Sequence, residues 1–401
     1  MSGKVVPRGS TATFKFVEGD LEVSRHAVVK GEGSPPEVKV SGTIYVSDDC
    51  VFDCSLSGEN LEGEGEVTIR GDLDIKNRVD VDDGRLFVSG SLAAKRVNVG
   101  RSLKVEKDLK VDEVDVGGSL EVGGKTEALS IDVGGKFQAN GVVKTRSIDV
   151  GGLVRVEAEV DVEDSIDAGG AVVVRGGRVN RVDVGGSLVS KESLRFEKID
   201  VGGSVKLAGG SSGGSIDVGG VCKVEGDLRF DNIDVGGVAV ISGSAEGTNL
   251  EVGGKVRVDG SINLSGRFEV GGKAKIEGTL KAQRVEVGGS LSAREAKVES
   301  RVTVGGSIET SDGVHASYVE VGRRGKVKGP INADEVFIGK GAHVEDIFAR
   351  RITLEREAEA RNLRGDSIRL GARCRISGEV KYTKSLEADR DVKFEREPQK
   401  V

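Results

Sequence analysis

Residues 147–152 read Ser-Ile-Asp-Val-Gly-Gly, and the same six residues return at 215–220. Variants of this stretch recur along most of the 401-residue chain, at steps of 16, 17 or 18 residues. The step is neither a heptad nor the roughly 30 to 45 residues of helix-pair and propeller repeats. A unit this short cannot bury a core alone, so each repeat is predicted to form one coil of a solenoid.

The residue before each glycine pair, or before the single glycine that follows Val99, Val321 and Ile338, sets the register of the repeat. It is followed from Val99 through Val116, Val133, Val150, Ala168, Val184, Val201, Val218, Val235, Val252, Val270, Val287, Val304, Val321 and Ile338. The regular spacing of these register positions predicts that equivalent residues stack from coil to coil.

Apolar residues alternate with polar ones inside each repeat. In residues 250–264 they occupy every second place within three short runs, which Gly or Ser separates. Period two predicts strands, and the 61 glycines and many β-branched residues oppose helix. We therefore predict an all-β fold: a single-stranded parallel β-helix of about 17 residues per coil with a roughly triangular cross-section. The glycine pair is predicted to form a corner, where Gly tolerates positive φ.

Three segments follow from the register. Residues 1–24 are predicted to cap the first coil, residues 25–390 to form one continuous β-helix of about 22 coils, most regular over 85–345, and residues 391–401 to be a loose tail. At about 4.8 Å per coil the helix would be a rod on the order of 100 Å long. Pro35 and Pro36 are expected at a corner or an edge, outside the central ladders.

Composition is consistent with a thin solenoid. Aromatic residues make up 3% and Trp is absent, as expected for a narrow core of Val, Ile and Leu. Charged residues make up 31%, which resembles thermophilic proteins or a chain that is simply very soluble. No apolar run resembles a signal peptide or a membrane span, and four Cys suit a reducing compartment, so a cytoplasmic location is expected.

A column of outward carboxylates is the first candidate site. Its members precede the register positions, and the regular ones are Asp115, Asp132, Asp149, Asp183, Asp200, Asp217, Asp234, Glu251, Glu269 and Glu286. The column has three interpretations: a solvated face, a ridge that binds cations or a basic partner, and the acid/base pair of an enzyme. The third is disfavoured because a periodic column distinguishes no two of its members. Basic residues on the next outward column are expected to neutralise it around the corner: Lys104, Arg155, Lys206, Lys223, Arg257, Lys275 and Lys326.

The remaining reactive residues predict no catalytic, metal or cofactor site. Cys50, Cys222 and Cys374 each lie four residues after a register position, where other coils carry inward Leu or Val, so they are predicted to be core thiols. Cys54 follows Cys50 at a Cys-x3-Cys spacing, but two further zinc ligands are not evident nearby. The three His are scattered, and no helix is available to bind a nucleotide phosphate.

Charge is uneven along the chain. Residues 323–401 contain 19 Lys and Arg against 14 Asp and Glu, a net +5, which leaves −12 for residues 1–322. The basic end would bind an acidic partner, including the opposite end of another rod, or form solvated pairs with Glu355, Glu357 and Glu359. Its arginines are Arg350, Arg351, Arg356, Arg361, Arg364, Arg369, Arg373 and Arg375.

Residues 276–289 and 327–344 follow the pattern Gly-x-Ile/Leu-x-Ala, then alternating apolar residues, then Gly. This pattern resembles the repeat of bactofilins, which are polymer-forming cytoskeletal proteins, and the resemblance covers about residues 40–386. It implies a right-handed β-helix that joins end to end into filaments without nucleotide. The chain departs from the family in its greater length, in its recurrent Val-Gly-Gly corner, and in lacking long tails or a membrane-targeting segment.

The ends of a β-helix expose unpaired backbone groups and an open apolar cross-section, which favour stacking. We therefore predict a non-enzymatic structural protein, a rod that polymerises with itself into cytoplasmic filaments or a scaffold, with other cytoskeletal or envelope-associated proteins as candidate partners. The alternative is an acidic binding module that mimics nucleic acid or docks a basic partner. Residues expected at the end-to-end contacts are Phe14, Phe16, Val23, Val392 and Phe394.

Overall fold

The computed structural model describes residues 3–401, which form strands joined by turns. Contacts divide the chain into two units, Met1–Gly202 (unit 1) and Gly203–Val401 (unit 2). In each unit, strands about 17 residues apart pair in parallel, and the chain makes roughly 23 turns of β-solenoid. The predicted fold class is therefore confirmed. The single continuous body predicted over residues 25–390 stays a prediction.

The strands of unit 1 are β1 (Lys4–Val6), β2 (Thr11–Phe14), β3 (Phe16–Val17), β4 (Leu21–Val23), β5 (Val28–Gly31), β6 (Glu37–Val40), β7 (Thr43–Val46), β8 (Cys50–Asp53), β9 (Ser55–Ile69), β10 (Leu73–Val88), β11 (Leu92–Ala93), β12 (Arg96–Val99), β13 (Ser102–Val105), β14 (Leu109–Lys110), β15 (Glu113–Val116), β16 (Ser119–Val122), β17 (Thr126–Glu127), β18 (Ser130–Val133), β19 (Lys136–Ala139), β20 (Val143–Val150), β21 (Leu153–Ala168), β22 (Ala171–Val184), β23 (Ser187–Ser190) and β24 (Leu194–Val201). Those of unit 2 are β25 (Ser204–Ala208), β26 (Ser211–Val218), β27 (Val221–Glu225), β28 (Leu228–Arg229), β29 (Asn232–Val235), β30 (Val238–Ile241), β31 (Ala245–Gly247), β32 (Asn249–Val252), β33 (Lys255–Val258), β34 (Ile262–Leu264), β35 (Arg267–Val270), β36 (Lys273–Val287), β37 (Ser290–Val304), β38 (Ser307–Val321), β39 (Lys326–Lys328), β40 (Ile331–Ile338), β41 (His343–Leu354), β42 (Glu359–Leu370), β43 (Arg375–Ile376), β44 (Val380–Ala388), β45 (Lys393–Phe394) and β46 (Gln399–Lys400).

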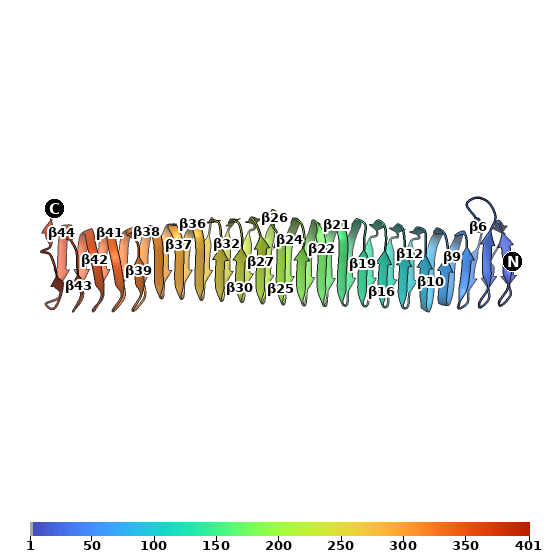
Figure 1. Ribbon diagram of the computed structural model, residues 1–401, viewed down its shortest axis with the longest axis horizontal. Coiled ribbons are helices and arrows are strands. Elements are labelled where there is room, and N and C mark those ends of the chain that lie inside the picture. The colour runs from blue at the N-terminus through green and yellow to red at the C-terminus, as the bar shows by residue number, and fades with distance from the viewer. Residues whose placement is uncertain (1–2) are drawn as a thin grey trace. The chain divides into compact units, whose positions relative to one another are not determined.

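Three faces recur in each regular turn. Face 1 ends on the register positions and includes β12, β15 and β18. Face 2 follows the glycine pair and includes β13, β16 and β19, while face 3 closes the turn and includes β11, β14 and β17. Each strand pairs with its counterpart one turn later, so the same residue position forms a row along a face. Figure 1 shows these successive turns within each unit.

The core of each unit is a stack of inward apolar side chains. On face 1, Val114 pairs with Ile131 and Val116 with Val133, and all four are at most 2% exposed. Full burial of such a side chain stabilises the fold by about 1.5–3 kcal/mol. Because the alternation of each strand places every second residue inside, the sequence period directly specifies this core.

The glycine pairs form tight corners, as predicted, but for a different reason. Among the described residues, no glycine directly after a register position from Val116 to Val304 has left-handed φ. A Cβ on Gly151 would instead lie 2.2 Å from the carbonyl oxygen of Gly134 in the preceding turn, and one on Gly152 would lie 2.5 Å from that of Gly135. The predicted role of positive φ is therefore wrong: the corner requires glycine because the stacked backbone occupies the space of a side chain.

The first described turn is a regular part of the solenoid. Strands β1, β2 and β3 pair in parallel with β4, β5 and β6, so residues 4–17 repeat the three faces. The capping role predicted for residues 1–24 stays a prediction. Pro35 and Pro36 lie in a loop that stands out between β5 and β6, outside the ladders as expected (Figure 1).

The loose tail predicted for residues 391–401 is wrong. Strand β45 pairs with β43, and β46 pairs with β44. The physical reason is that the register continues: Phe394 takes the row of Ile376, which is 1% exposed, and adds one more residue to that apolar stack.

One core position carries a hydroxyl without a partner. Thr126 is fully buried between Leu109 and Val143 of the adjoining turns, and its Oγ1 has no hydrogen-bond partner among the described residues. An unsatisfied buried hydroxyl costs about 1–3 kcal/mol. We expect Thr126→Val to raise the free energy of unfolding by about that amount, measured from the urea midpoint.

Thr145 provides the matched control. It is 2% exposed, but its hydroxyl makes hydrogen bonds to the carbonyl oxygens of Leu129 and Ser147 at 3.3 and 3.2 Å. Thr145→Val should therefore lower stability by about 0.5–1.5 kcal/mol. Equal effects of the two substitutions would contradict this account of the core.

Candidate functional site

The outward carboxylates form in-register rows, as predicted. In unit 1 each member pairs with the next one along face 1, and this acidic row consists of Asp115, Asp132, Asp149, Asp167, Asp183 and Asp200. The acidic row of unit 2 consists of Asp217, Asp234, Glu251, Glu269 and Glu286. At a strand spacing of about 4.8 Å, each neighbouring pair repels by roughly 1 kcal/mol in water and less in salt.

The predicted neutralisation around the corner is wrong. Arg155 lies 3.4 Å from Glu157, and Arg257 lies 2.8 Å from Asp259. In both pairs the carboxylate follows the arginine by two residues in the chain. The other bases of this column behave alike: Lys104 pairs with Glu106, Lys206 and Lys223 pair with Glu225, and Lys275 pairs with Glu277. Residues at i and i+2 share a face, whereas the acidic row lies beyond the glycine corner. Lys326 lies in the neighbouring outward row, opposite Ser307.

Most of the acidic rows are left without cations. Lys198 lies 3.4 Å from Asp200, Arg284 lies 3.9 Å from Glu286, and the Ser165 hydroxyl donates to Asp167 at 2.6 Å. Among residues 3–401, no ion pair is made by Asp115, Asp132, Asp149, Asp183, Asp217, Asp234, Glu251 and Glu269. Nor does any group of His, Cys, Asp and Glu within residues 3–401 have an arrangement that could hold a metal ion. The rows are therefore extended charged surfaces rather than a centre with a few distinguished members.

The arginines near the C-terminus are mostly neutralised. Ion pairs join Arg350 to Asp334, Arg351 to Glu335, Arg361 to Asp346, Arg369 to Glu387 and Arg373 to Glu357. Within the described part of the chain, Arg356, Arg364 and Arg375 have no such pair. Of the three glutamates expected as partners, Glu357 binds Arg373, Glu359 lies 3.1 Å from His343, and Glu355 accepts the backbone N–H of Lys340.

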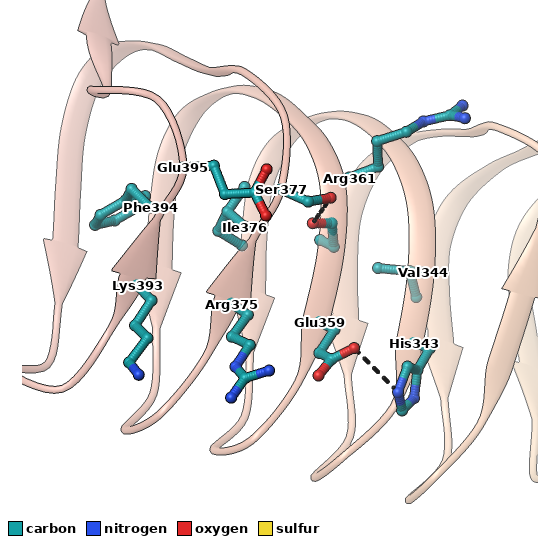
Figure 2. Close-up of a pocket in the computed structure, with 11 residues that line it drawn as sticks. His343, Val344, Glu359, Arg361, Arg375, Ile376, Ser377, Lys393, Phe394 and Glu395 are labelled. Carbon is teal, nitrogen blue, oxygen red and sulfur yellow. Dashed lines mark hydrogen bonds and ion pairs between the residues drawn. The ribbon is translucent and has the colours of Figure 1, made fainter.

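A groove of about 570 Å³ runs along face 2 in the last turns of unit 2. His343, Glu359, Arg375 and Lys393 line one side in successive turns, as Figure 2 shows. Arg361 stands on the other side but bonds to Asp346, so its charge is already compensated. Arg375 and Lys393 thus present two adjacent cations with no carboxylate partner of their own.

The four cysteines are buried, as predicted for core thiols. Each is at most 2% exposed and none is in a disulfide. Burial raises the pKa of Cys54 to about 11 and that of Cys222 to about 12, from an ordinary value of 9.0. The thiol of Cys374 hydrogen-bonds to the carbonyl oxygen of Glu355 at 3.0 Å. These environments disfavour the reactive thiolate.

We expect the native thiols to resist alkylation at pH 8. A pKa near 11 for Cys54, against 9.0 for an ordinary thiol, lowers the thiolate fraction about 100-fold, and burial blocks the reagent further. Because the unfolded chain loses these protons first, stability should fall as the pH rises from 9.0 towards 11. Iodoacetamide labelling followed by mass spectrometry should modify Cys54 and Cys222 only after urea unfolds the chain. Rapid labelling in buffer would contradict the burial described here.

Four of the five predicted end-contact residues lie in the first or last described turns. Phe14 is half-buried on β2, Phe16 is 60% exposed on β3, and Phe394 is half-buried on β45, with Val392 just before it. Val23 is a correction: it is fully buried, because β1 forms a further ladder outside it and Val6 lies over it.

No family model, no curated protein and no solved structure matches the chain. Residues 3–401 also contain no helix of the length and apolarity that a membrane span needs. The solenoid itself defines the class of fold, and the outward rows and terminal edges are the features from which a function is inferred.

Proposed function

We propose that this protein is a non-enzymatic structural protein of the cytoplasm, whose solenoids join end to end into filaments or a scaffold without nucleotide. The proposal agrees with the resemblance of its repeats to those of bactofilins. It assigns the strand edges of the terminal turns as the contact surfaces and a second copy of the chain as the partner.

The observation that carries the proposal is the edge of the first described turn. The Lys4 N–H donates to Asp20 at 2.8 Å, and the Val6 carbonyl accepts from Ser24 at 3.0 Å. Because successive residues of a strand point their N–H and C=O groups in opposite directions, those of Val5 point away from the second turn. Such an edge is a template for another strand.

The last described turn offers a complementary edge. Residues 385–388 of β44 lie on face 1, and β45 and β46 continue over faces 2 and 3. The first turn presents β1, β2 and β3 over the same faces in the same order. Parallel pairing of the two turns would continue every ladder from one copy into the next.

The substitution Val5→Pro tests the proposal. It removes the outward N–H of the edge while sparing the inward bonds of Lys4 and Val6, and Val5 is 61% exposed. We expect negative-stain microscopy to show long threads for the wild type and single particles or short threads for Val5→Pro. Val5→Thr keeps the N–H and should polymerise normally. Threads of wild-type length from Val5→Pro would contradict the assignment of this edge.

A second candidate function is favoured by the unpaired acidic rows: an acidic module that docks a basic partner. It predicts binding of a basic nucleic-acid-binding protein that weakens steeply with salt. Replacing Asp132, Asp149 and Asp183 by Asn should weaken such binding, whereas the threads of the first proposal should persist in that variant.

A further inference from the structure

Face 2 of unit 2 carries a row of cations next to the glycine corners. Its nine members pair in register from one turn to the next, and they are Lys255, Lys273, Ser290, Ser307, Lys326, His343, Glu359, Arg375 and Lys393. We name this set the basic row. Its only carboxylate is Glu359, which lies 3.1 Å from His343.

The cations of the basic row are exposed and uncompensated. Lys255, Lys273, Lys326, Arg375 and Lys393 all have exposed side chains, and none makes an ion pair with any residue in 3–401. Lys255 and Lys273 occupy adjacent turns, as do Arg375 and Lys393. Like charges at this spacing repel, so the row gains from an anionic surface placed against it.

This charge is specific to unit 2. The equivalent positions in unit 1 include Arg85, which lies 3.5 Å from Glu66 of the preceding turn, followed by Ser102, Ser119, Lys136, Leu153, Ala171 and Ser187. Arg85 and Lys136 lie three turns apart, so they give no pair of adjacent cations there. Both units carry an acidic row on face 1, with six successive carboxylates in unit 1 and five in unit 2. Unit 1 therefore presents the longer acidic row and no basic row of its own, whereas unit 2 presents rows of both signs.

The groove of Figure 2 gives the basic row room for a partner. Arg375 and Lys393 line it in adjacent turns, and Figure 2 shows their side chains extended along the same side. Glu395 and the Ser377 hydroxyl lie opposite, and Arg361 is held by Asp346. Among the described residues Glu395 makes no ion pair with Arg375 or Lys393, so the two cations of the basic row remain available to an incoming carboxylate.

We propose that the basic row of unit 2 docks laterally on the acidic row of unit 1 of a second copy of this chain. Both rows advance one residue per turn, at the same strand spacing of about 4.8 Å. A row of carboxylates at this spacing therefore matches the adjacent cations Lys255 and Lys273, and likewise Arg375 and Lys393. Ser290, Ser307 and Glu359 interrupt the match between these two pairs. The contact joins two different surfaces, so a docked pair still has one free basic row and one free unit 1 acidic row, and association continues beyond a pair.

This lateral contact is distinct from joining at the ends. Single exposed ion pairs are weak, but a matched row of them also relieves the repulsion inside both rows. We expect the contact to form in about 0.05 M salt and to be lost in about 1 M salt, where the screening length is about 3 Å.

Charge reversal tests the proposal. One variant carries Asp132→Lys, Asp149→Lys and Asp183→Lys, so three of the six members of its unit 1 acidic row are basic and the row has no net negative charge. A second carries Lys255→Glu, Lys273→Glu and Arg375→Glu, so both of its surfaces are acidic. In sedimentation velocity at low salt, the lateral association of each variant alone should be weaker than that of the wild type by about tenfold or more. An equal mixture of the two variants should restore association.

The matched control reverses three exposed carboxylates of unit 1 outside the row, by Glu159→Lys, Glu163→Lys and Glu197→Lys. It has the same change in net charge as the first variant and should associate as the wild type does. Circular dichroism and the urea midpoint establish that every variant is folded.

Failure of the mixture to restore association would overturn the proposal, as would normal association of either row variant alone. The proposal would also be overturned if the basic row bound a short single-stranded DNA while the Asp→Lys variant associated normally. That result would assign the basic row to nucleic acid. Microscopy separates this outcome from the fate of the end contacts, because loss of docking leaves threads unbundled, whereas loss of end joining leaves laterally associated short particles and no threads.

Discussion

Gly151→Ala should destabilise the protein by about 3 kcal/mol or more, at the upper end of the range for overpacking. The new Cβ would lie 2.2 Å from the carbonyl oxygen and 3.2 Å from the carbonyl carbon of Gly134. These are backbone atoms that no rotamer change can move away. Relief requires the two turns to separate, which weakens the hydrogen bond from the Gly151 N–H to Val133, 3.0 Å long in the native corner. Urea unfolding followed by circular dichroism measures the loss.

Gly9→Ala separates this steric effect from backbone preference. Gly9 has a φ of +66°, and no heavy atom lies within 4 Å of the place where a Cβ would stand. Its substitution should cost only the strain of a left-handed alanine, about 1 kcal/mol. If Gly151→Ala were as mild as Gly9→Ala, the account of the glycine corners would be wrong.

Phe137→Ala should lower the free energy of unfolding by about 3–5 kcal/mol. Phe137 is fully buried on β19, with Leu120 of the preceding turn and Val154 of the following turn in register with it. The substitution removes the largest side chain of this stack and leaves a cavity that a rigid coil cannot close. Because each turn of a solenoid contacts its neighbours alone, hydrogen exchange should rise first in β16, β19 and β21.

Phe16→Ala is the control for this prediction. Phe16 is 60% exposed on β3, so its removal should change stability by no more than about 0.5 kcal/mol. A loss from Phe137→Ala no larger than that from Phe16→Ala would mean that the stacked column does not carry the stability of the fold.

The faces and rows of the solenoid could be predicted from sequence because two periods coincide. The period of two separates inward Ile148 from outward Asp149, and the period of about 17 aligns Asp149 with Asp132. Together they specify the fold class, the core and the acidic rows. The glycine corners were placed correctly but explained wrongly, since the decisive contact is between turns. The glycine pairs that recur from Val116 to Val304 are the sequence signal of that contact, because stacked glycines place two backbones against each other with no side chain between them.

The ion pairs could not be predicted with the same certainty. Arg257 has the acidic row on one side of its turn and Asp259 on the other, and the chain direction alone does not choose between them. The structure shows the pair with Asp259 at 2.8 Å, because residues two apart extend from one face. The basic row was missed for a related reason. From the sequence, Arg375 counts toward the charge excess after residue 323 and Lys326 toward the neutralising column, whereas the structure places both in one row with Lys255 and Lys273.

The termini show the limit of sequence periodicity. Residues 4–6 and 393–394 match the repeat too weakly to be recognised, yet they pair with β4 and β43. A preceding turn templates the next one, because its edge already presents the hydrogen-bonding groups and the apolar stack. This templating is also the physical basis of the proposed end contacts.

Fibre diffraction from aligned threads of the purified protein tests the central claim most directly. If each copy continues the ladders of the last, strands lie across the thread and turns stack along it. The account predicts a strong reflection at about 4.8 Å along the thread axis, in the absence of nucleotide. Threads without an oriented reflection at that spacing, or a protein that remains as single particles at every concentration, would contradict it.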